Sequence, residues 1–393
     1  MTKKLNLYYL VNFLYNFARV LPHSILTVLL MNKGISLAEI SLIQSFYMLT
    51  ALISEFPSGV LTEIIGEKKM YQISLILLGI SYLGVYVFDD VFLLSIIWGI
   101  YGLSSAAMSG TLDAYFYKNL KKEGKSIKEF NIKNRYSLLI SSLIGAMFGA
   151  FLYKHIGINL YLISIVILIL ALFILSFFIK IEANRTSSGK HISIKYQIRN
   201  IVRETISLKS DLKLMYLILL SCSFQIVVQL YFQYWQVFFQ QKEIKVAYFG
   251  IIYALFQIIA ILSTYVFSKF TLNKTPFRLI IMLISIVSLS LLFSLFSTNI
   301  LIFAILFSIF LLTFNLYDNV LEYLIMRNVK SQFMSSFISL FGTLSSIVST
   351  IILWVMSILL SFQSLERVSF YLIVVFLLLS LILCYKYYTV KSK

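Results

Sequence analysis

Charged residues are scarce in this chain of 393 residues. They make up 12% of the sequence, whereas a soluble domain has about 25%. Hydrophobic residues make up 60%. No water-soluble core in a chain of this length could bury so much apolar surface, so the composition excludes a soluble globular protein.

Cysteine and histidine are scarce as well. The two cysteines lie inside apolar runs and the three histidines are scattered, so neither a disulfide framework nor a metal site is expected. No G-x-x-x-x-G-K-S/T loop occurs, so the chain is not expected to hydrolyse ATP. Because nucleophiles, bases and metal ligands do not cluster, we expect neither an enzyme nor a cofactor.

Long apolar runs fill most of the chain and predict an all-α membrane protein. A helix needs about 20 apolar residues to cross the ~30 Å hydrocarbon layer. Twelve runs meet this length, at 7–31, 37–60, 70–88, 91–117, 135–154, 159–180, 214–240, 246–270, 277–297, 299–326, 334–360 and 367–388. Polar residues interrupt the first run, so it is not expected to be a cleavable signal peptide.

Basic residues are distributed unevenly between alternate loops. If the N-terminus is cytoplasmic, the inner segments hold 27 of the 33 Lys and Arg residues, and the outer loops hold five. Such a bias marks the cytoplasmic side of membrane proteins. It predicts that both termini are cytoplasmic, and it explains the net charge of +17 without nucleic acid. The abundance of Ile, Lys, Asn and Phe is typical of an AT-rich bacterial genome, so we expect the bacterial inner membrane.

The spans divide into two equal sets. Residues 1–180 hold six spans, residues 214–393 hold six more, and residues 181–213 form a basic connector. The connector is either a solvated linker or a helix on the anionic inner leaflet. Two six-span halves joined by a basic loop are typical of parallel-repeat transporters, whose binding site lies near the midplane between the halves.

The most specific pattern lies at the end of the second span. It reads Glu55-Phe-Pro-Ser-Gly59-Val-Leu-Thr-Glu63-Ile-Ile-Gly66-Glu-Lys68-Lys69. This stretch resembles the loop between the second and third helices of the major facilitator superfamily, although that family usually has Asp where this chain has Glu63. The Glu-x-Pro-Ser-Gly sequence narrows the resemblance to a poorly characterised bacterial branch.

The resemblance implies twelve helices in two six-helix bundles and a secondary transporter that works by alternating access. It assigns this loop to conformational gating. Gly59 is expected to let helices approach closely, and Gly66 to permit a tight turn with positive φ. Glu63 can face a helix N-terminus or an arginine, and Lys68 and Lys69 hold the loop at the inner surface.

Two patterns of drug/proton antiporters are missing. The fourth span lacks an arginine near its start, and no proline follows Gly149 in the fifth span. Both absences argue against proton-driven drug export of the kind those antiporters carry out.

Ionisable side chains inside the spans require a reason, because each costs several kcal/mol there. Asn12, Asn16, Arg19 and His23 are spaced 4, 3 and 4 residues apart, so they share one helical stripe that cannot face lipid. Arg19 either contacts a solute in a cavity or is a structural residue paired with Glu55 or a carbonyl group. His23 is either packed in the bundle or part of a proton relay.

The acidic residues of the spans have several possible roles. Glu55 either binds a proton, pairs with Arg19 or braces the kink at Pro57. Asp113 and Glu322 each stand five residues before a basic residue, at the inner ends of the corresponding fourth and tenth spans. This correspondence favours an inner-gate role, with Arg135 as a candidate partner of Asp113.

The second half carries two polar faces. Asn315, Asp318 and Glu322 share one face of the tenth span, and the deeper Asp318 is the better candidate for contact with the cavity. In the seventh span, Gln225, Gln229 and Gln233 repeat every four residues beside aromatic side chains. This stripe either binds an amphiphilic solute or joins helices by hydrogen bonds.

The preferred function is therefore a monomeric permease that moves a small organic solute, by proton-coupled efflux of an amphiphilic compound. Uptake of a polar metabolite and a non-transporting sensor or scaffold are the alternatives. The residues predicted to contact the solute or ion are Arg19, Asn16, His23, Glu55, Gln229, Gln233, Asn315 and Asp318. Those predicted to act in gating are Gly59, Glu63, Gly66, Lys68, Lys69, Asp113, Arg135 and Glu322.

Overall fold

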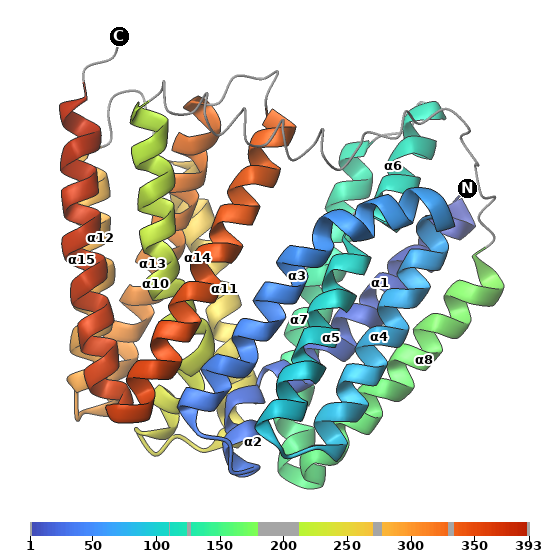
Figure 1. The fold of residues 1–393 in the computed structure, drawn as a ribbon, viewed down its shortest axis with the longest axis horizontal. Coiled ribbons are helices and arrows are strands. Elements are labelled where there is room, and N and C mark those ends of the chain that lie inside the picture. The colour runs from blue at the N-terminus through green and yellow to red at the C-terminus, as the bar shows by residue number, and fades with distance from the viewer. Residues whose placement is uncertain are drawn as a thin grey trace. The chain divides into compact units, whose positions relative to one another are not determined.

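The computed structural model describes residues 2–109, 111–123, 127–179, 212–269, 277–328 and 334–390. Within these ranges the chain forms α-helices and two short 3-10 turns, with no strand (Figure 1). The expectation of an all-α protein is confirmed. The predicted connector at 181–213 lies outside the described residues, except for its last two.

The helices of the first half are separated by short breaks. They are α1 (Thr2–His23), α2 (Leu26–Asn32), α3 (Leu37–Ile65), α4 (Glu67–Val87), α5 (Val91–Met108), α6 (Leu112–Lys122), α7 (Ile127–Ile156), the 3-10 turn η1 (Gly157–Asn159) and α8 (Leu160–Phe178).

The second half has longer, unbroken helices. They are α10 (Leu212–Gln240), the 3-10 turn η2 (Val246–Tyr248), α11 (Phe249–Ser268), α12 (Phe277–Phe296), α13 (Ile300–Asn328), α14 (Met334–Phe362) and α15 (Leu365–Thr389).

The number of membrane-spanning segments agrees with the twelve predicted runs. Among the described residues, ten helical segments are long and apolar enough to cross a membrane, and the bent pair α1–α2 is an eleventh. One of the ten is the 46-residue run Lys133–Phe178, which contains both α7 and α8. At 1.5 Å per residue, this run is about twice as long as the hydrocarbon layer is thick, so it supplies two crossings.

Two predicted spans are broken, which the apolar pattern alone did not indicate. The first bends by 48° between α1 and α2, just after Pro22, which cannot donate a backbone hydrogen bond. The fourth was predicted to run over 91–117, but α5 ends at Met108 and α6 begins at Leu112. The intervening Ser109-Gly110-Thr111 has poor helix formers, whose cost outweighs the apolar continuity of the run.

The chain divides into two compact units. The first comprises Met1–Arg185 and Phe239–Ala254, and the second comprises Thr186–Phe238 and Leu255–Lys393. Each unit has its own packed interior and is described below by itself.

Small residues allow helices of the first unit to approach closely. The helix pairs α1–α7 and α3–α5 pack along much of their lengths. A Cβ atom added at Gly149 of α7 would overlap the carbonyl oxygen of Leu21 in α1 and lie 2.8 Å from the Ser24 hydroxyl. On α3, the Thr50 hydroxyl donates to the carbonyl oxygen of Gly99 in α5 at 2.9 Å. Such contacts are typical of helices packed inside membranes.

The second unit is held by serine hydrogen bonds and aromatic packing. The Ser223 and Ser380 hydroxyls join α10 to α15 at 2.8 Å, and Ser263 of α11 donates to the carbonyl oxygen of Leu312 in α13 at 3.1 Å. Aromatic rings of α10, α11 and α13 fill the interior between these helices, including Phe224, Tyr231, Phe256, Phe307, Phe310 and Phe314. The helices of this unit therefore need few charges to associate.

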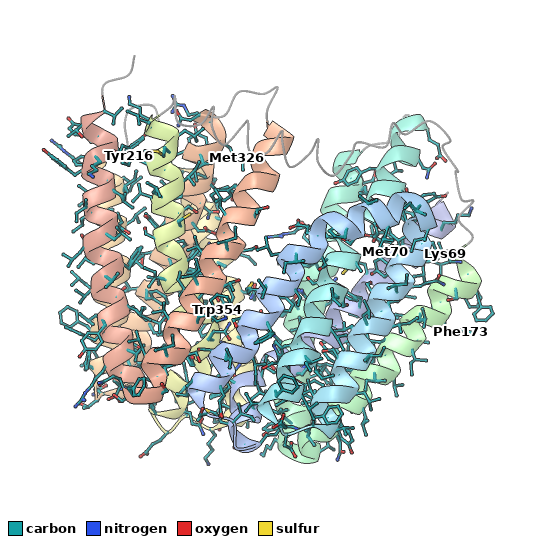
Figure 2. The ribbon with its side chains drawn as sticks, viewed as in Figure 1. Lys69, Met70, Phe173, Tyr216, Met326 and Trp354 are labelled. Atoms are coloured by element: carbon teal, nitrogen blue, oxygen red, sulfur yellow. The ribbon has the colours of Figure 1, made fainter. Side chains whose placement is uncertain are left out.

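Apolar side chains cover the outward faces of the helices, as at Phe173 of α8 (Figure 2). Many large aliphatic and aromatic residues are exposed in this way along both units. A soluble monomer rarely exposes so much contiguous apolar surface, so these faces fit contact with lipid.

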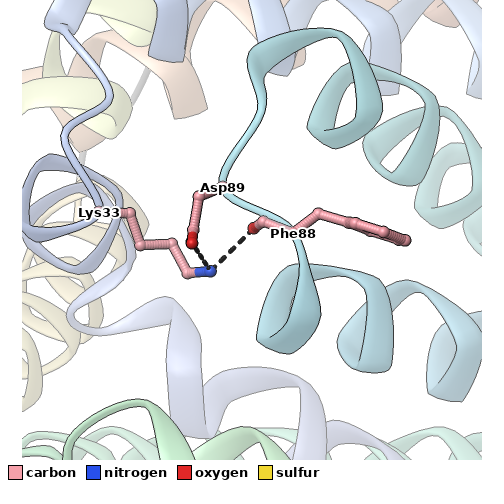
Figure 3. A network of polar contacts seen from close by, with 3 residues as sticks. All are labelled: Lys33, Phe88 and Asp89. Atoms are coloured by element: carbon pink, nitrogen blue, oxygen red, sulfur yellow. Dashed lines mark hydrogen bonds and ion pairs between the residues drawn. The ribbon is translucent and has the colours of Figure 1, made fainter.

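Lys33 lies in a loop predicted to be on the outer side, where basic residues are rare. Its ammonium group is 2.6 Å from a carboxylate oxygen of Asp89 and 2.8 Å from the carbonyl oxygen of Phe88 (Figure 3). The Lys33 side chain is 9% exposed. The contact ties the loop after α2 to the loop between α4 and α5, so this exception to the charge bias has a structural reason.

Candidate solute site and gating residues

The polar stripe of α1 is part of a buried hydrogen-bond network. The Asn12 side chain donates to the side-chain oxygen of Asn134 in α7 at 2.6 Å. One turn further along α1, Asn16 donates to the carbonyl and side-chain oxygens of Asn12 at 2.8 and 2.9 Å. Asn12 and Asn16 are 4% and 3% exposed. The predicted stripe therefore faces the interior of the first unit, where Asn16 is already engaged.

Asp113 lies in the first turn of α6, at the end of this network nearest the start of α1. The Tyr8 hydroxyl donates to its carboxylate, and the Asn134 amide donates to the same oxygen at 3.3 Å. The position near a helix N-terminus further favours a negative charge. Asp113 thus joins α1, α6 and α7 through neutral donors.

The expected pairing of Asp113 with Arg135 is wrong. Arg135 is exposed, and no ion pair between the two occurs in the described part of the chain. The neighbouring residue Asn134 faces Asp113 instead, because successive positions on a helix point about 100° apart.

We expect Tyr8→Phe to destabilise the protein by about 1–3 kcal/mol, because it removes a donor from the Asp113 carboxylate. Tyr9→Phe is the matched control, since the Tyr9 hydroxyl is buried without a hydrogen-bond partner among the described residues. Its removal should leave stability unchanged or raise it slightly. Thermal unfolding of the purified variants in detergent gives the comparison, and equal losses in both variants would show that the Tyr8–Asp113 bond contributes nothing.

Arg19 lies one turn beyond Asn16 and is surrounded by tyrosines. Its electrostatic neighbours are the phenol groups of Tyr15, Tyr47, Tyr82 and Tyr101, which come from α1, α3, α4 and α5. The ring centroids of Tyr47 and Tyr101 are 4.9 Å apart, and those of Tyr82 and Tyr101 are 6.1 Å apart. The Tyr82 hydroxyl donates to the carbonyl oxygen of Arg19 at 3.1 Å, so it supports the backbone at this point.

No carboxylate pairs with Arg19 in the part of the chain that the structure describes. Five acids of the first unit have other partners: Asp89 pairs with Lys33, Asp90 caps α5, Glu39 caps α3, Glu129 pairs with Lys133, and Asp113 binds Tyr8 and Asn134. Glu55 is exposed on α3 and forms no ion pair with Arg19. The alternative that Glu55 neutralises Arg19 is therefore wrong in this conformation.

A small cavity lies beside the Arg19 side chain. Its walls include His23, Tyr82, Trp98, Tyr101 and Tyr161, and its volume is about 10 Å³, which is room for about one water molecule. The half-buried guanidinium and the exposed His23 border it. The cavity can hold a small polar group and not a whole organic solute.

The glutamines of α10 in the second unit are mostly buried. Gln225 accepts a hydrogen bond from Ser349 of α14 at 3.1 Å, so it joins two helices, as one of the two interpretations of this stripe proposed. Gln229 is 3% exposed, and its side-chain oxygen has no hydrogen-bond donor among the described residues. Gln233 is also buried. The side-chain oxygen of Gln229 can therefore accept a hydrogen bond inside the second unit.

Acidic side chains are exposed on α13. Asp318 and Glu322, one turn apart, are both accessible on this helix, whereas Asn315 donates to the carbonyl oxygen of Leu311 at 2.7 Å. Carboxylates at this depth are too costly to face hydrocarbon. This face of α13 must therefore meet water or polar groups.

The loop after α3 contains the tight turn with positive φ that was predicted at Gly66. Gly66 ends α3 with φ 92° and ψ 150°, a backbone region that is essentially restricted to glycine. Lys68 donates to the carbonyl oxygen of Ser176 near the C-terminus of α8 at 2.9 Å, where helix carbonyls lack internal partners. Lys69 is exposed. The tight turn at Gly66 is confirmed.

Gly59 does not bring helices together as predicted. A Cβ atom added there would meet none of the described residues within 4 Å, because this face of α3 is exposed. The Glu63 side chain lies outside the described part of the structure.

Sequence reasoning missed the tyrosines around Arg19 and the role of Tyr8. Tyr8 lies four residues before Asn12, so it extends the stripe of α1 by one turn, and this spacing could have identified it. The tyrosines around Arg19 gave no such signal, because the chain contains 26 tyrosines and their convergence depends on how four helices pack.

The sequence profile of the Major Facilitator Superfamily matches residues 8–353. The chain belongs to this family. The resemblance found in the loop after the second span is thereby confirmed, and membership of a transporter family agrees with the expectation that the chain is not an enzyme.

Known proteins similar to this chain fall in the same family. It is 25% identical over 258 residues to YxaM, an uncharacterized MFS-type transporter of Bacillus subtilis (strain 168), and this match covers 63% of the chain and 62% of that relative. The chain thus aligns with about six-tenths of the curated relative's length.

Three solved structures have a similar fold. The nucleoside transporter NupG has a TM-score of 0.76 at 13% identity, with 100% of both chains covered. An auto-inhibited POT family peptide transporter has 0.74 at 10% identity, covering 99% of this chain and 98% of its own. A bacterial homologue of the human lysosomal transporter Spinster has 0.72 at 10% identity, covering 98% and 95%. These TM-scores establish a common fold, and together with the family match they confirm the expected twelve-helix architecture.

Proposed function

We propose that the chain is a secondary active transporter that moves a small organic solute across the bacterial inner membrane by alternating access. The carrying observation is Arg19, a permanent positive charge at span depth without an acidic partner among the described residues. A charge without an acidic partner inside a membrane span is strongly unfavourable, so a protein retains one where a ligand can neutralise it. In a chain of a transporter family, that ligand is the solute.

The solute contacts of this proposal come from both halves, 1–180 and 214–393. Arg19 and the adjacent His23 bind one polar end of the solute. Gln229, with its open oxygen, and Gln233 supply hydrogen-bonding groups from α10. Asp318 and Asn315 supply polar groups from α13. Asn16 supports Arg19 through the network on α1, and residues 181–213 join the halves on the cytoplasmic side, where both termini also lie.

Gating in this proposal depends on the inner ends of the helices. Asp113 fastens α1 to α6 and α7, and Glu322 occupies the corresponding inner end of α13. The Gly59–Lys69 segment, with its glycine-only turn at Gly66 and the Lys68 contact to α8, favours one of the two access states. Arg135 is exposed near the start of α7, where it is available to a second state.

The coupling ion is the proton, and the direction is export of an amphiphilic compound. Glu55, Asp113 and Asp318 are the carboxylates assigned to proton coupling, and the side chains of Glu55 and Asp318 are exposed. The aromatic side chains around Arg19, and those interleaved with the glutamines along α10, suit a solute with an apolar body. The transporter works as a monomer embedded in the bilayer.

The test is solute movement in proteoliposomes with an acidic lumen, offered a mixture of small organic solutes and analysed by mass spectrometry. An antiporter should accumulate at least one amphiphilic solute above its external concentration, and a protonophore should abolish the accumulation. Protein-free vesicles are the control.

The other outcomes of this experiment identify the alternatives. Accumulation only with an alkaline lumen would replace export by proton-coupled uptake. No movement under either gradient, from protein that remains folded, would contradict transport and favour a sensor or scaffold.

A further inference from the structure

A large cavity lies at one end of α12, α14 and α15 in the second unit. Its volume is about 660 Å³, and it is bordered by the last residue of α12, the turn between α14 and α15 and the first two turns of α15. Pockets of about 300–1,000 Å³ hold small organic ligands. None of the residues predicted to contact the solute borders this cavity, so it is separate from the candidate solute site.

The cavity lies at the depth of the lipid headgroups. Helix α15 has 25 residues, so at 1.5 Å per residue it is about 38 Å long. The hydrocarbon layer is only about 30 Å thick, and the ends of α15 therefore reach the polar region of the bilayer. The turn that precedes α15 is predicted to be on the outer side, which places the cavity in the outer leaflet.

Exposed aromatic side chains form the apolar part of the cavity. Phe362 at the end of α14 is 81% exposed, and Phe296 at the end of α12 is 54% exposed. Phe370 and Tyr371 of α15 are exposed as well, and the rings of Phe296 and Phe370 pack edge to face with centroids 6.3 Å apart. A small water-soluble ligand would leave most of this surface in water. A lipid covers it with its glycerol and upper acyl chains.

Two charged side chains of opposite sign border the same cavity. Glu366 and Arg367 are both exposed, and neither forms an ion pair with the other or with any further residue that the structure describes. Arg367 donates instead to the neutral side-chain oxygen of Gln363 at 3.3 Å. Like Lys33, Arg367 is a basic residue on the predicted outer side, but it has no carboxylate partner. The cavity thus offers one positive and one negative group to a ligand.

We propose that this cavity binds the headgroup of phosphatidylethanolamine, with the phosphate on Arg367 and the ammonium on Glu366. A guanidinium forms strong paired hydrogen bonds with a phosphate, and a primary ammonium has three N–H donors for a carboxylate. An ethylene unit joins the phosphate and the ammonium in this headgroup, so neighbouring side chains of one helical turn can hold both. The inference concerns a lipid partner and does not depend on the transported solute.

Other phospholipids match the two charges less well. Phosphatidylglycerol brings a phosphate for Arg367 but no cation, so its negative charge meets the Glu366 carboxylate without compensation. Phosphatidylcholine has both charges, but methyl groups replace the N–H donors of its ammonium. The combination of Glu366 and Arg367 therefore selects a zwitterionic headgroup with a primary ammonium.

Native mass spectrometry of the delipidated protein in detergent measures the selection directly. The probes are phosphatidylethanolamine, phosphatidylglycerol and phosphatidylcholine with identical acyl chains, and phosphoethanolamine without chains. Phosphatidylethanolamine should give the tightest first binding step and the largest rise in unfolding temperature. Phosphoethanolamine should bind far more weakly, because it cannot cover the aromatic side chains.

Two variants separate the two charges. Arg367→Gln should weaken the binding of phosphatidylethanolamine and of phosphatidylglycerol by about 10-fold each, the value of one charge-assisted hydrogen bond. Glu366→Gln should weaken phosphatidylethanolamine by about 10-fold and leave phosphatidylglycerol unchanged or bound more tightly. Arg278→Gln and Glu243→Gln are the matched controls, because both replace exposed charged residues away from the cavity. They should bind phosphatidylethanolamine as the unsubstituted protein does.

Several results would overturn the assignment. Equal binding of phosphatidylethanolamine and phosphatidylglycerol by the unsubstituted protein would exclude the role of Glu366. Unchanged phosphatidylethanolamine binding by either cavity variant, or equal losses in the controls, would exclude this site. Tight binding of phosphoethanolamine would show that the ligand is a soluble molecule. A lower unfolding temperature of the cavity variants in lipid-free detergent would show that the two side chains serve the fold instead.

Discussion

Gly149→Leu should strongly destabilise the first unit. The position lies where α7 meets α1, and even a Cβ atom there would overlap the carbonyl oxygen of Leu21 and crowd Ser24. A backbone oxygen cannot rotate away as a side chain can, so relief requires the two helices to separate. Overpacking typically costs 1–3 kcal/mol, and separating two long packed helices should cost at least about that much.

The measurement is the yield of monodisperse protein after detergent extraction, followed by thermal unfolding. Gly79→Leu on α4 is the matched control, because an added Cβ atom at Gly79 meets no described residue within 4 Å. The control should be extracted in normal yield. Equal behaviour of Gly149→Leu and Gly79→Leu would contradict the close approach of α1 and α7.

The same contact affects function, because α1 carries Arg19 and the network of Asn12 and Asn16. The close packing of α7 places Asn134 within hydrogen-bonding distance of Asn12 and Asp113. A larger residue at position 149 would therefore displace the polar network together with the backbone. The contact between α1 and α7 therefore supports both the packing of the first unit and the polar network next to Arg19.

The sequence predicts the helices and their number because each membrane span is marked by its own run of apolar residues, whatever its neighbours in the fold are. Twelve apolar runs, the bias of basic residues and the loop pattern ending at Gly66 each act independently of tertiary detail. Their agreement by itself indicates the family. The apolar pattern does not reveal the breaks near Ser24 and Ser109, because both runs remain apolar across them. Only backbone hydrogen bonding distinguishes a bent helix from a straight one.

The site was predictable only in part, for a physical reason. Helical spacing placed Asn12, Asn16 and Arg19 on one face, and the structure shows the first two in one network. Spacing cannot tell which neighbouring helix meets that face. For this reason the sequence suggests Arg135 as a partner of Asp113 and Glu55 as one possible partner of Arg19, although neither pair forms among the described residues.

The absence of an acidic partner for Arg19 could not be read from the sequence at all. It required the positions of all acids in the described first unit, since a single displaced carboxylate would have changed the conclusion. The structure shows Glu39 and Asp90 in helix caps, Asp89 and Glu129 in ion pairs with lysines, Asp113 in its network and Glu55 exposed. The charge on Arg19 is therefore the feature of the unit that most requires a ligand.

The central claim is that Arg19 serves the solute and not the fold. Arg19→Gln breaks no ion pair of the described residues, so it should unfold at the temperature of the unsubstituted protein or above it. A side chain that neutralises the solute should be worth about 2–5 kcal/mol, so transport by this variant should fall by at least about 30-fold.

The decisive measurement is the initial rate at which Arg19→Gln moves, in proteoliposomes, the solute identified with the unsubstituted protein, alongside its thermal unfolding. The account predicts a folded protein that has lost nearly all transport, with Arg19→Lys retaining an intermediate rate. Transport at the unsubstituted rate, or a variant that loses its fold together with its activity, would contradict it.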